Sequence, residues 1–202
     1  MPLLKQTRLY RFLKLCDEGR ADKSVLYCGA GGDMPFLSEF FARGYLTTGV
    51  EIDARRMAIA NEFGEARGQS LKVQLGDMRR LGFADSSFGC VYSYNTIFHM
   101  PKADVEIALG ELKRVLKPGG YLFVNFLSVD DHRCGEGPCL GLNQYEQLDD
   151  GLPVIHSYYK HSEADPYFAD MTQHVKETRI IEWRYEGRPI RQGFVDYIVQ
   201  KK

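Results

Sequence analysis

The sequence has no apolar run near the ~20 residues that a membrane-spanning helix requires, and it contains neither internal repeats nor low-complexity tracts. Its first segment, from Met1 to Glu18, is amphipathic and basic, unlike the apolar core of a signal peptide. These absences lead us to expect a soluble, cytoplasmic protein without a membrane partner.

Cysteine is sparse and charge is balanced. The five cysteines are an odd number and lie scattered along the chain, which favours reduced thiols over a disulfide framework. The formal net charge of −1 provides no broad basic surface, so nucleic acid is not an expected partner. The length of 202 residues is most simply one domain, and we expect residues 1–202 to form it.

Strand-like and helix-like segments alternate along the chain. Apolar runs typical of buried strands occur at 25–28, 47–52, 71–75, 88–93 and 121–127, and segments with helical spacing lie between most of them. An N-terminal helix is expected within residues 1–20, laid across the domain. Parallel strands need crossovers, which are usually helices, so the alternation predicts an α/β fold with a mostly parallel sheet.

The last third of the chain has a different pattern. Residues 128–151 are polar and rich in Gly and Asp, without a clear period, so they are expected to form a lid loop. The alternating runs 179–185 and 194–199 indicate an antiparallel hairpin that closes the chain.

A glycine turn ends the first strand. Gly29 and Gly31 let the backbone approach a ligand closely, and Glu51 ends the next strand, where a carboxylate can accept both hydroxyls of a ribose. Asp77-Met78 and Tyr94-Asn95 follow two later strands. Because the carboxyl ends of parallel strands meet at one edge of a sheet, these groups predict a nucleotide-binding site there.

The chain resembles the class I S-adenosylmethionine (SAM)-dependent methyltransferases, in the group labelled methyltransferase type 11. The likeness rests on four stretches, the third of which continues with Leu81 and Phe83: Val25-Leu26-Tyr27-Cys28-Gly29-Ala30-Gly31, Gly49-Val50-Glu51-Ile52-Asp53, Gly76-Asp77-Met78 and Arg114-Val115-Leu116-Lys117-Pro118-Gly119-Gly120. The resemblance implies a Rossmann-like, doubly wound, seven-stranded and mostly parallel sheet in a three-layer sandwich, with an antiparallel C-terminal hairpin.

The resemblance also implies roles for individual residues. Glu51 would accept the ribose hydroxyls, Asp77 would accept from the adenine amine, and Ile52 would pack on the adenine. The full implied cofactor set is Gly29, Ala30, Gly31, Asp33, Glu51, Ile52, Asp77, Met78 and Tyr94. The implied catalytic residues, facing the sulfonium and the acceptor, are His99, Tyr94 and Asn95.

The implied reaction converts SAM to S-adenosylhomocysteine, and His99 is the candidate base if the acceptor must lose a proton. Enzymes that methylate exocyclic amines have two prolines after strand four, and Asn95-Thr96-Ile97-Phe98 lacks both. A small-molecule acceptor is therefore favoured. His156, Tyr158 and Tyr159 are either core residues or lining of the acceptor pocket.

Two positions depart from the family pattern. Tyr27 stands where an acidic residue is usual, and Asp33, where a third glycine is usual, either substitutes for that carboxylate or caps the next helix. Two other functions stay open: a non-catalytic SAM-binding module, and an NAD(P)-dependent oxidoreductase. Met34 weighs against the second, because it occupies the third glycine of the dinucleotide fingerprint.

No metal site is expected. His132, Cys134 and Cys139 carry zinc-ligand side chains, but their spacing fits none of the compact zinc patterns and a fourth ligand is not evident.

Overall fold

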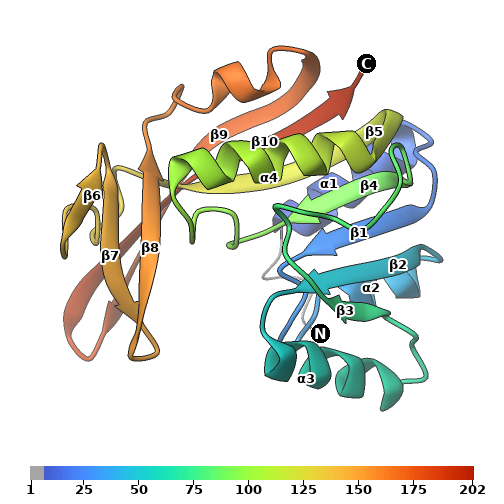
Figure 1. The fold of residues 1–202 in the computed structure, drawn as a ribbon, viewed down its shortest axis with the longest axis horizontal. Helices are drawn as coiled ribbons and strands as arrows, with labels where there is room; N and C mark the ends of the chain where they lie inside the picture. Colours follow the sequence, from blue (N-terminus) through green and yellow to red (C-terminus); the bar gives the residue numbers. More distant parts are fainter. Residues whose placement is uncertain (1–6) are drawn as a thin grey trace.

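The computed structural model describes residues 7–202 and has helices on both faces of a central sheet (Figure 1). The helices are α1 (Thr7–Glu18), α2 (Leu37–Ala42), α3 (Ala54–Glu65), α4 (Lys102–Val115) and the short 3-10 helix η2 (Asp165–Phe168). The strands are β1 (Ser24–Cys28), β2 (Leu46–Glu51), β3 (Val73–Leu75), β4 (Phe88–Ser93), β5 (Leu116–Ser128), β6 (Cys139–Gly141), β7 (Gln144–Asp149), β8 (Leu152–Tyr159), β9 (Met171–Tyr185) and β10 (Arg188–Lys201).

The central sheet confirms the expected α/β fold. Strands β3, β2, β1, β4 and β5 lie side by side in that order, and every pair among them is parallel. Strand β10 pairs antiparallel with β5, and β9 pairs antiparallel with β10. These seven strands are the mostly parallel, Rossmann-like sheet with its C-terminal hairpin.

The expectation of seven strands was too low, because residues 7–202 contribute ten strands to the sheet. Strand β8 pairs parallel with the end of β5 at Leu127 and Ser128, and β7 and β6 extend β8 as an antiparallel ladder. This ladder projects from the sheet on the left in Figure 1.

The expectation that residues 128–151 form a loop was wrong for the part that contains β6 and β7. The role of the segment as a lid stays a prediction. A turn at Asp150 and Gly151, both with positive φ (51° and 80°), joins β7 to β8. Only Gln147 of β7 is buried, so the strand has no apolar alternation to reveal it. Its pairing with β8 satisfies backbone groups that a loop would leave to water.

The terminal hairpin is confirmed and is longer than expected. Glu186 and Gly187 join β9 to β10 and both have positive φ (50° and 76°), as a type I′ turn requires. The buried residues of β10 run from Gly193 to Val199, and all of them except Gly193 pair with β5. The first half extends beyond the central sheet with mostly exposed side chains.

Helices cover both faces of the sheet, so the fold has three layers. The side chains of α1, α2 and α3 join one buried apolar cluster, and α4 and η2 join the other. No helix among residues 7–202 is long and apolar enough to cross a membrane. The covering helix expected within residues 1–20 is α1, and residues 1–6 lie outside the described part.

Phe12 fixes α1 to the sheet. Its fully buried ring contacts Phe40 of α2, Tyr92 of β4 and Phe123 of β5, at centroid distances of 6.2, 5.3 and 6.3 Å. Helix α1 is therefore part of the core.

We expect Phe12→Ala to lower the free energy of unfolding by about 3–5 kcal/mol, because the deletion leaves a cavity among packed aromatic rings. The matched control on the same helix is Lys14→Ala, whose side chain is 65% exposed and whose removal should change stability by less than about 0.5 kcal/mol. Urea unfolding of both variants is the measurement. Equal losses would contradict the anchoring role of Phe12.

Candidate functional site

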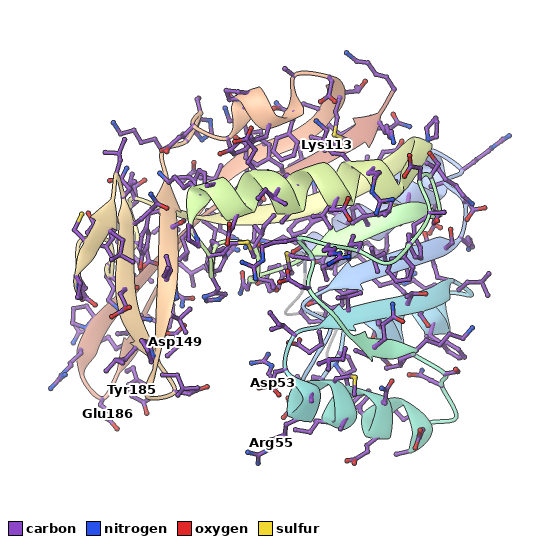
Figure 2. The ribbon with its side chains drawn as sticks, in the orientation of Figure 1. Asp53, Arg55, Lys113, Asp149, Tyr185 and Glu186 are labelled. Carbon is purple, nitrogen blue, oxygen red and sulfur yellow. The ribbon has the colours of Figure 1, made fainter. Side chains whose placement is uncertain are left out.

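A cavity of about 370 Å³ opens at the carboxyl ends of the parallel strands. One wall consists of residues that follow β1, β2, β3 and β4, and the other consists of Pro153, Val154 and Ile155 of β8. In Figure 2 the labelled Asp149, on the ladder, and Asp53, before α3, face each other from these two parts of the molecule. The remaining lining residues are Gly29, Val50, Glu51, Ile52, Gly76, Asp77, Met78, Arg79, Thr96, His99, Met100 and Pro101.

Hydrogen bonds to β8 hold the loop that follows β4. The backbone N–H of Ser157 donates to the carbonyl of Phe98 at 2.9 Å, and the Ser157 hydroxyl donates to the carbonyl of Met100 at 2.7 Å. His99, between these two residues, is thereby positioned at the junction of the sheet and the ladder.

The glycine turn after β1 leaves no space for side chains. Gly29 has φ +82°, and a Cβ there would lie 2.1 Å from Oγ1 of Thr96. A Cβ on Gly31 would lie 2.5 Å from Oε2 of Glu51. Both positions therefore require glycine for conformation or for close approach.

Backbone donors hold the Glu51 carboxylate in place. Oε2 accepts from the N–H of Gly31 at 2.8 Å, and Oε1 accepts from the N–H groups of Ile52 and Asp53 at 2.9 and 3.1 Å. Glu51 is only 6% exposed, whereas Ile52 is 68% exposed beside it on the cavity wall. The site thus presents a fixed anionic group next to an exposed apolar one.

Asp77 is engaged by an arginine that the sequence did not single out. Both of its carboxylate oxygens accept from Arg79, whose guanidinium also donates to Asp104 at 2.5 Å. The hydrogen bond from Arg79 lowers the pKa of Asp77 below its usual value. A ligand amine at this carboxylate would have to share it with Arg79. Met78 is buried and also lines the cavity.

Tyr27, at the position of the usual acidic residue, belongs to an aromatic cluster. Its ring stacks on Phe36 at 5.8 Å and meets Tyr92 edge-on at 5.4 Å. Burial raises the pKa of its hydroxyl, so the group stays neutral. The position therefore contributes packing in place of charge.

Five expected residues do not line the cavity, and Gly31, whose N–H donates to Glu51, is one of them. Tyr94 is half-buried against Phe36, and Ala30 is fully buried. Asn95 is exposed and exchanges two hydrogen bonds with Asn125, at 2.7 and 2.8 Å. Asp33 is exposed, and α2 begins without a side-chain cap, so Asp33 does not cap it.

His99 lies beside two residues of the ladder. Oδ2 of Asp149 is 3.0 Å from Nε2 of the buried His156 and 3.8 Å from Nδ1 of His99. Within residues 7–202, His99, Asp149 and His156 form a group of three side chains that could bind a metal ion. His132, Cys134 and Cys139 do not belong to this group.

These donors are of types that bind divalent cations. However, Arg133 donates to Oδ1 of Asp149 at 2.8 Å, and this fixed positive charge disfavours a cation beside it. The arrangement is better suited to holding and moving a proton.

Both imidazoles are neutral at pH 7. Burial, together with the neighbouring His156, lowers the pKa of His99 to about 4, although Asp149 opposes the shift. Burial also lowers the pKa of His156. Burial raises the pKa of Asp149, but Arg133 and the two histidines outweigh it and leave a lowered value. A neutral imidazole beside a carboxylate can accept a proton.

Sequence reasoning missed several lining residues. Thr96 and Arg79 lie next to expected residues and could have been suspected from that proximity. Pro153, Val154 and Ile155 lie in a segment for which the sequence predicted no role. Asp149, which lies beside His99, is in the segment expected to be a lid loop, and no motif marked it. Tyr158 and Tyr159, which were left between core and pocket, are buried and absent from the cavity wall.

The fold and the site together define the class I SAM-dependent methyltransferase architecture. The strand order, the reversed terminal strand and the Gly29–Glu51 cradle all meet that description. Residues 26–124 match the model of the family described as methyltransferase domain.

Solved structures support the fold. A protein of Pyrococcus horikoshii superposes with a TM-score of 0.75 at 17% identity, covering 98% of this chain and 90% of the other. A SAM-dependent methyltransferase of Methanosarcina mazei gives 0.70 at 22% identity, covering 88% and 92%.

Relatives of known activity match parts of the chain. A sterol 4-C-methyltransferase of Caenorhabditis elegans is 26% identical over 83% of this chain and 48% of its own length. A demethylmenaquinone methyltransferase of Thermus thermophilus is 35% identical over 52% of this chain and 47% of its own. The chain thus spans about half the length of these relatives.

We expect the imidazole of His99 to titrate near pH 4 in a histidine NMR titration. Replacing Asp149 with asparagine should lower this pKa further, because the charge that favours the imidazolium is removed. Unfolded histidine titrates near pH ~6.5, so the unfolded state binds more protons between these values, and stability should fall as pH falls through that window. A His99 titration near pH ~6.5 would contradict the structure.

Proposed function

We propose that this protein transfers a methyl group from SAM to a small-molecule acceptor. The observation that carries the proposal is the cavity in which the glycine cradle, the buried Glu51 and the Asp77-Met78 pair meet at one edge of the sheet. The methyltransferase-domain match over the same segment supports it.

The residues present fit SAM. Gly29 and Gly31 leave a cradle that a Cβ would fill, and the buried Glu51 carboxylate borders it. Glu51 would hold the ribose, Ile52 would cover the adenine, and Met78 would line its edge. Bound SAM supplies a methyl group on a positively charged sulfur that an acceptor atom can displace.

The chain has little chemistry to perform beyond orientation and proton removal. The β8 wall faces the strand ends across the cavity, so both reactants would be aligned with water partly excluded. His99 lines the same cavity and is neutral at pH 7, so its imidazole would accept a proton from the acceptor. Asp149 would stabilise the resulting imidazolium.

The relatives favour a small acceptor of the kind their names describe, a sterol or a quinone. Those enzymes are longer than this chain, so the acceptor assigned here is the broader class of small molecules. A screen of such acceptors that detects S-adenosylhomocysteine formation tests the activity directly. If the protein bound SAM but no acceptor class yielded S-adenosylhomocysteine, the remaining function would be that of a non-catalytic SAM-binding module.

Glu51→Ala should weaken S-adenosylhomocysteine binding about 10- to 100-fold, because a charged hydrogen-bond acceptor for the ribose is lost. Isothermal titration calorimetry measures the affinity, and a melting curve reports whether the glycine turn remains folded. The control is Glu65→Ala, which removes an exposed carboxylate from α3. Unchanged affinity in the Glu51 variant would refute the cofactor assignment.

His99→Gln should lower the rate of S-adenosylhomocysteine formation about 10²- to 10⁴-fold and leave its binding affinity unchanged. The rate is measured with the best acceptor from the screen, under saturating SAM. If the rate remained at the wild-type level, His99 would have no role as a base for that acceptor.

A further inference from the structure

A second polar cluster lies away from the cavity, under α1. The carboxylate oxygen Oδ2 of Asp196, on β10, accepts from Nε of Arg8 at 2.7 Å and from Nε of Arg179 at 3.1 Å. Asp196 is 1% exposed and Arg179 is 9% exposed. Two guanidinium groups thus share one buried carboxylate. The neighbouring Glu177 already pairs with Arg11.

Several atoms of this cluster make no hydrogen bond in the described structure. They are both terminal nitrogens of Arg179, Oδ1 of Asp196 and the hydroxyl of Tyr92, each of them buried. Burial raises the pKa of Tyr92, and the charges of Asp196 and Arg8 also act on it, in opposite directions. Buried polar groups almost always have partners, because desolvating them unpaired costs free energy.

The charge and shape of the unpaired atoms specify a ligand group. The cluster carries one excess positive charge, which a monoanion would balance. The terminal nitrogens of Arg179 form a planar fork that matches a carboxylate, and the ring of Phe194, 4.2 Å away, holds the guanidinium flat. The free oxygen of Asp196 needs a donor, such as a hydroxyl or an amine of the same molecule.

The position of the cluster connects it to the end of β4. Asp196 pairs in register with Asn125 of β5, and the Asn125 side chain exchanges hydrogen bonds with Asn95. Arg179 and Asp196 do not line the cavity that holds Glu51 and Asp77. Asn125 thus links the cluster to Asn95, the residue that the sequence placed among those facing the acceptor.

We propose that Arg179, with Asp196 and Arg8, forms a subsite for the carboxylate of the methyl acceptor, which is then a small carboxylic acid bearing a hydroxyl or amine. This inference rests on the proposed methyltransferase function. The same carboxylate chemistry exists in the methionine part of SAM, and the separation from the Glu51 cavity favours the acceptor as its source.

The test uses formate, the smallest carboxylate, as the probe. The melting temperature of the wild-type protein should rise with formate relative to chloride at equal ionic strength. Arg179→Met should need about tenfold or more formate for the same rise, because the charged fork is lost. The matched control is Arg184→Met, which removes an exposed arginine from the same strand and should respond like the wild type.

Without formate, Arg179→Met should melt no lower than the wild type, since Arg8 and Asp196 remain as a balanced pair. A structural arginine would instead lower the melting temperature when removed. If the methionine variant failed to fold, Arg179→Lys would replace it, because lysine keeps the charge and loses the fork. Equal formate responses in the wild type and the Arg179 variants would overturn the proposal.

A second experiment distinguishes the methyl acceptor from SAM as the source of the bound carboxylate. Saturating S-adenosylhomocysteine should leave the formate response intact, and its affinity should be the same in the wild type and in Arg179→Met. Loss of the response together with weakened S-adenosylhomocysteine binding would assign the subsite to the cofactor and overturn the acceptor assignment. Absence of S-adenosylhomocysteine binding by the wild type would instead refute the methyltransferase function, while the formate arm still reports on the subsite.

Discussion

The whole site depends on β5 extending further than its neighbour β4. Strand β4 ends at Ser93, opposite Val124, while β5 continues to Ser128. The backbone groups along that last part of the β5 edge need partners, and β8 provides them at Leu127 and Ser128. The space between the end of β4 and the diverging β8 becomes the cavity, and the loop that carries His99 crosses it.

A second constraint is the way two buried carboxylates are held, that of Glu51 at the cavity and that of Asp196 under α1, away from the cavity. The Glu51 carboxylate is held by backbone N–H groups, which are fixed by the strand and turn themselves. The Asp196 carboxylate is held by two arginines, so its surroundings retain positive charge. The first arrangement presents an acceptor to a ligand, and the second presents a donor fork. The two arrangements therefore differ in the kind of ligand group that they would favour.

Much of the parallel core could be predicted from the sequence. Strand β4 was expected at 88–93 and has those bounds, and the glycine turn and Glu51 lie at neighbouring strand ends as expected. The ladder could not be predicted in the same way, because Gln144–Asp149 has mixed exposure on both faces and pairs only within its own hairpin. Tyr27 and Asp77 show a further limit. Their positions could be located from the motifs, but their contacts could not. Tyr27 stacks on Phe36, and the carboxylate of Asp77 accepts hydrogen bonds from Arg79.

The sequence by itself determined the elements whose signal is local: apolar runs for the parallel strands, alternating runs for the terminal hairpin, glycine where positive φ is required, and the order of motifs along residues 25–127. Only the tertiary structure decided which distant side chains meet. Asp149 and His156 reach His99 because β8 pairs with β5, and Arg8 reaches Asp196, 188 positions away, because α1 lies across the sheet. Such contacts depend on strand register and helix placement, which no short stretch of sequence contains.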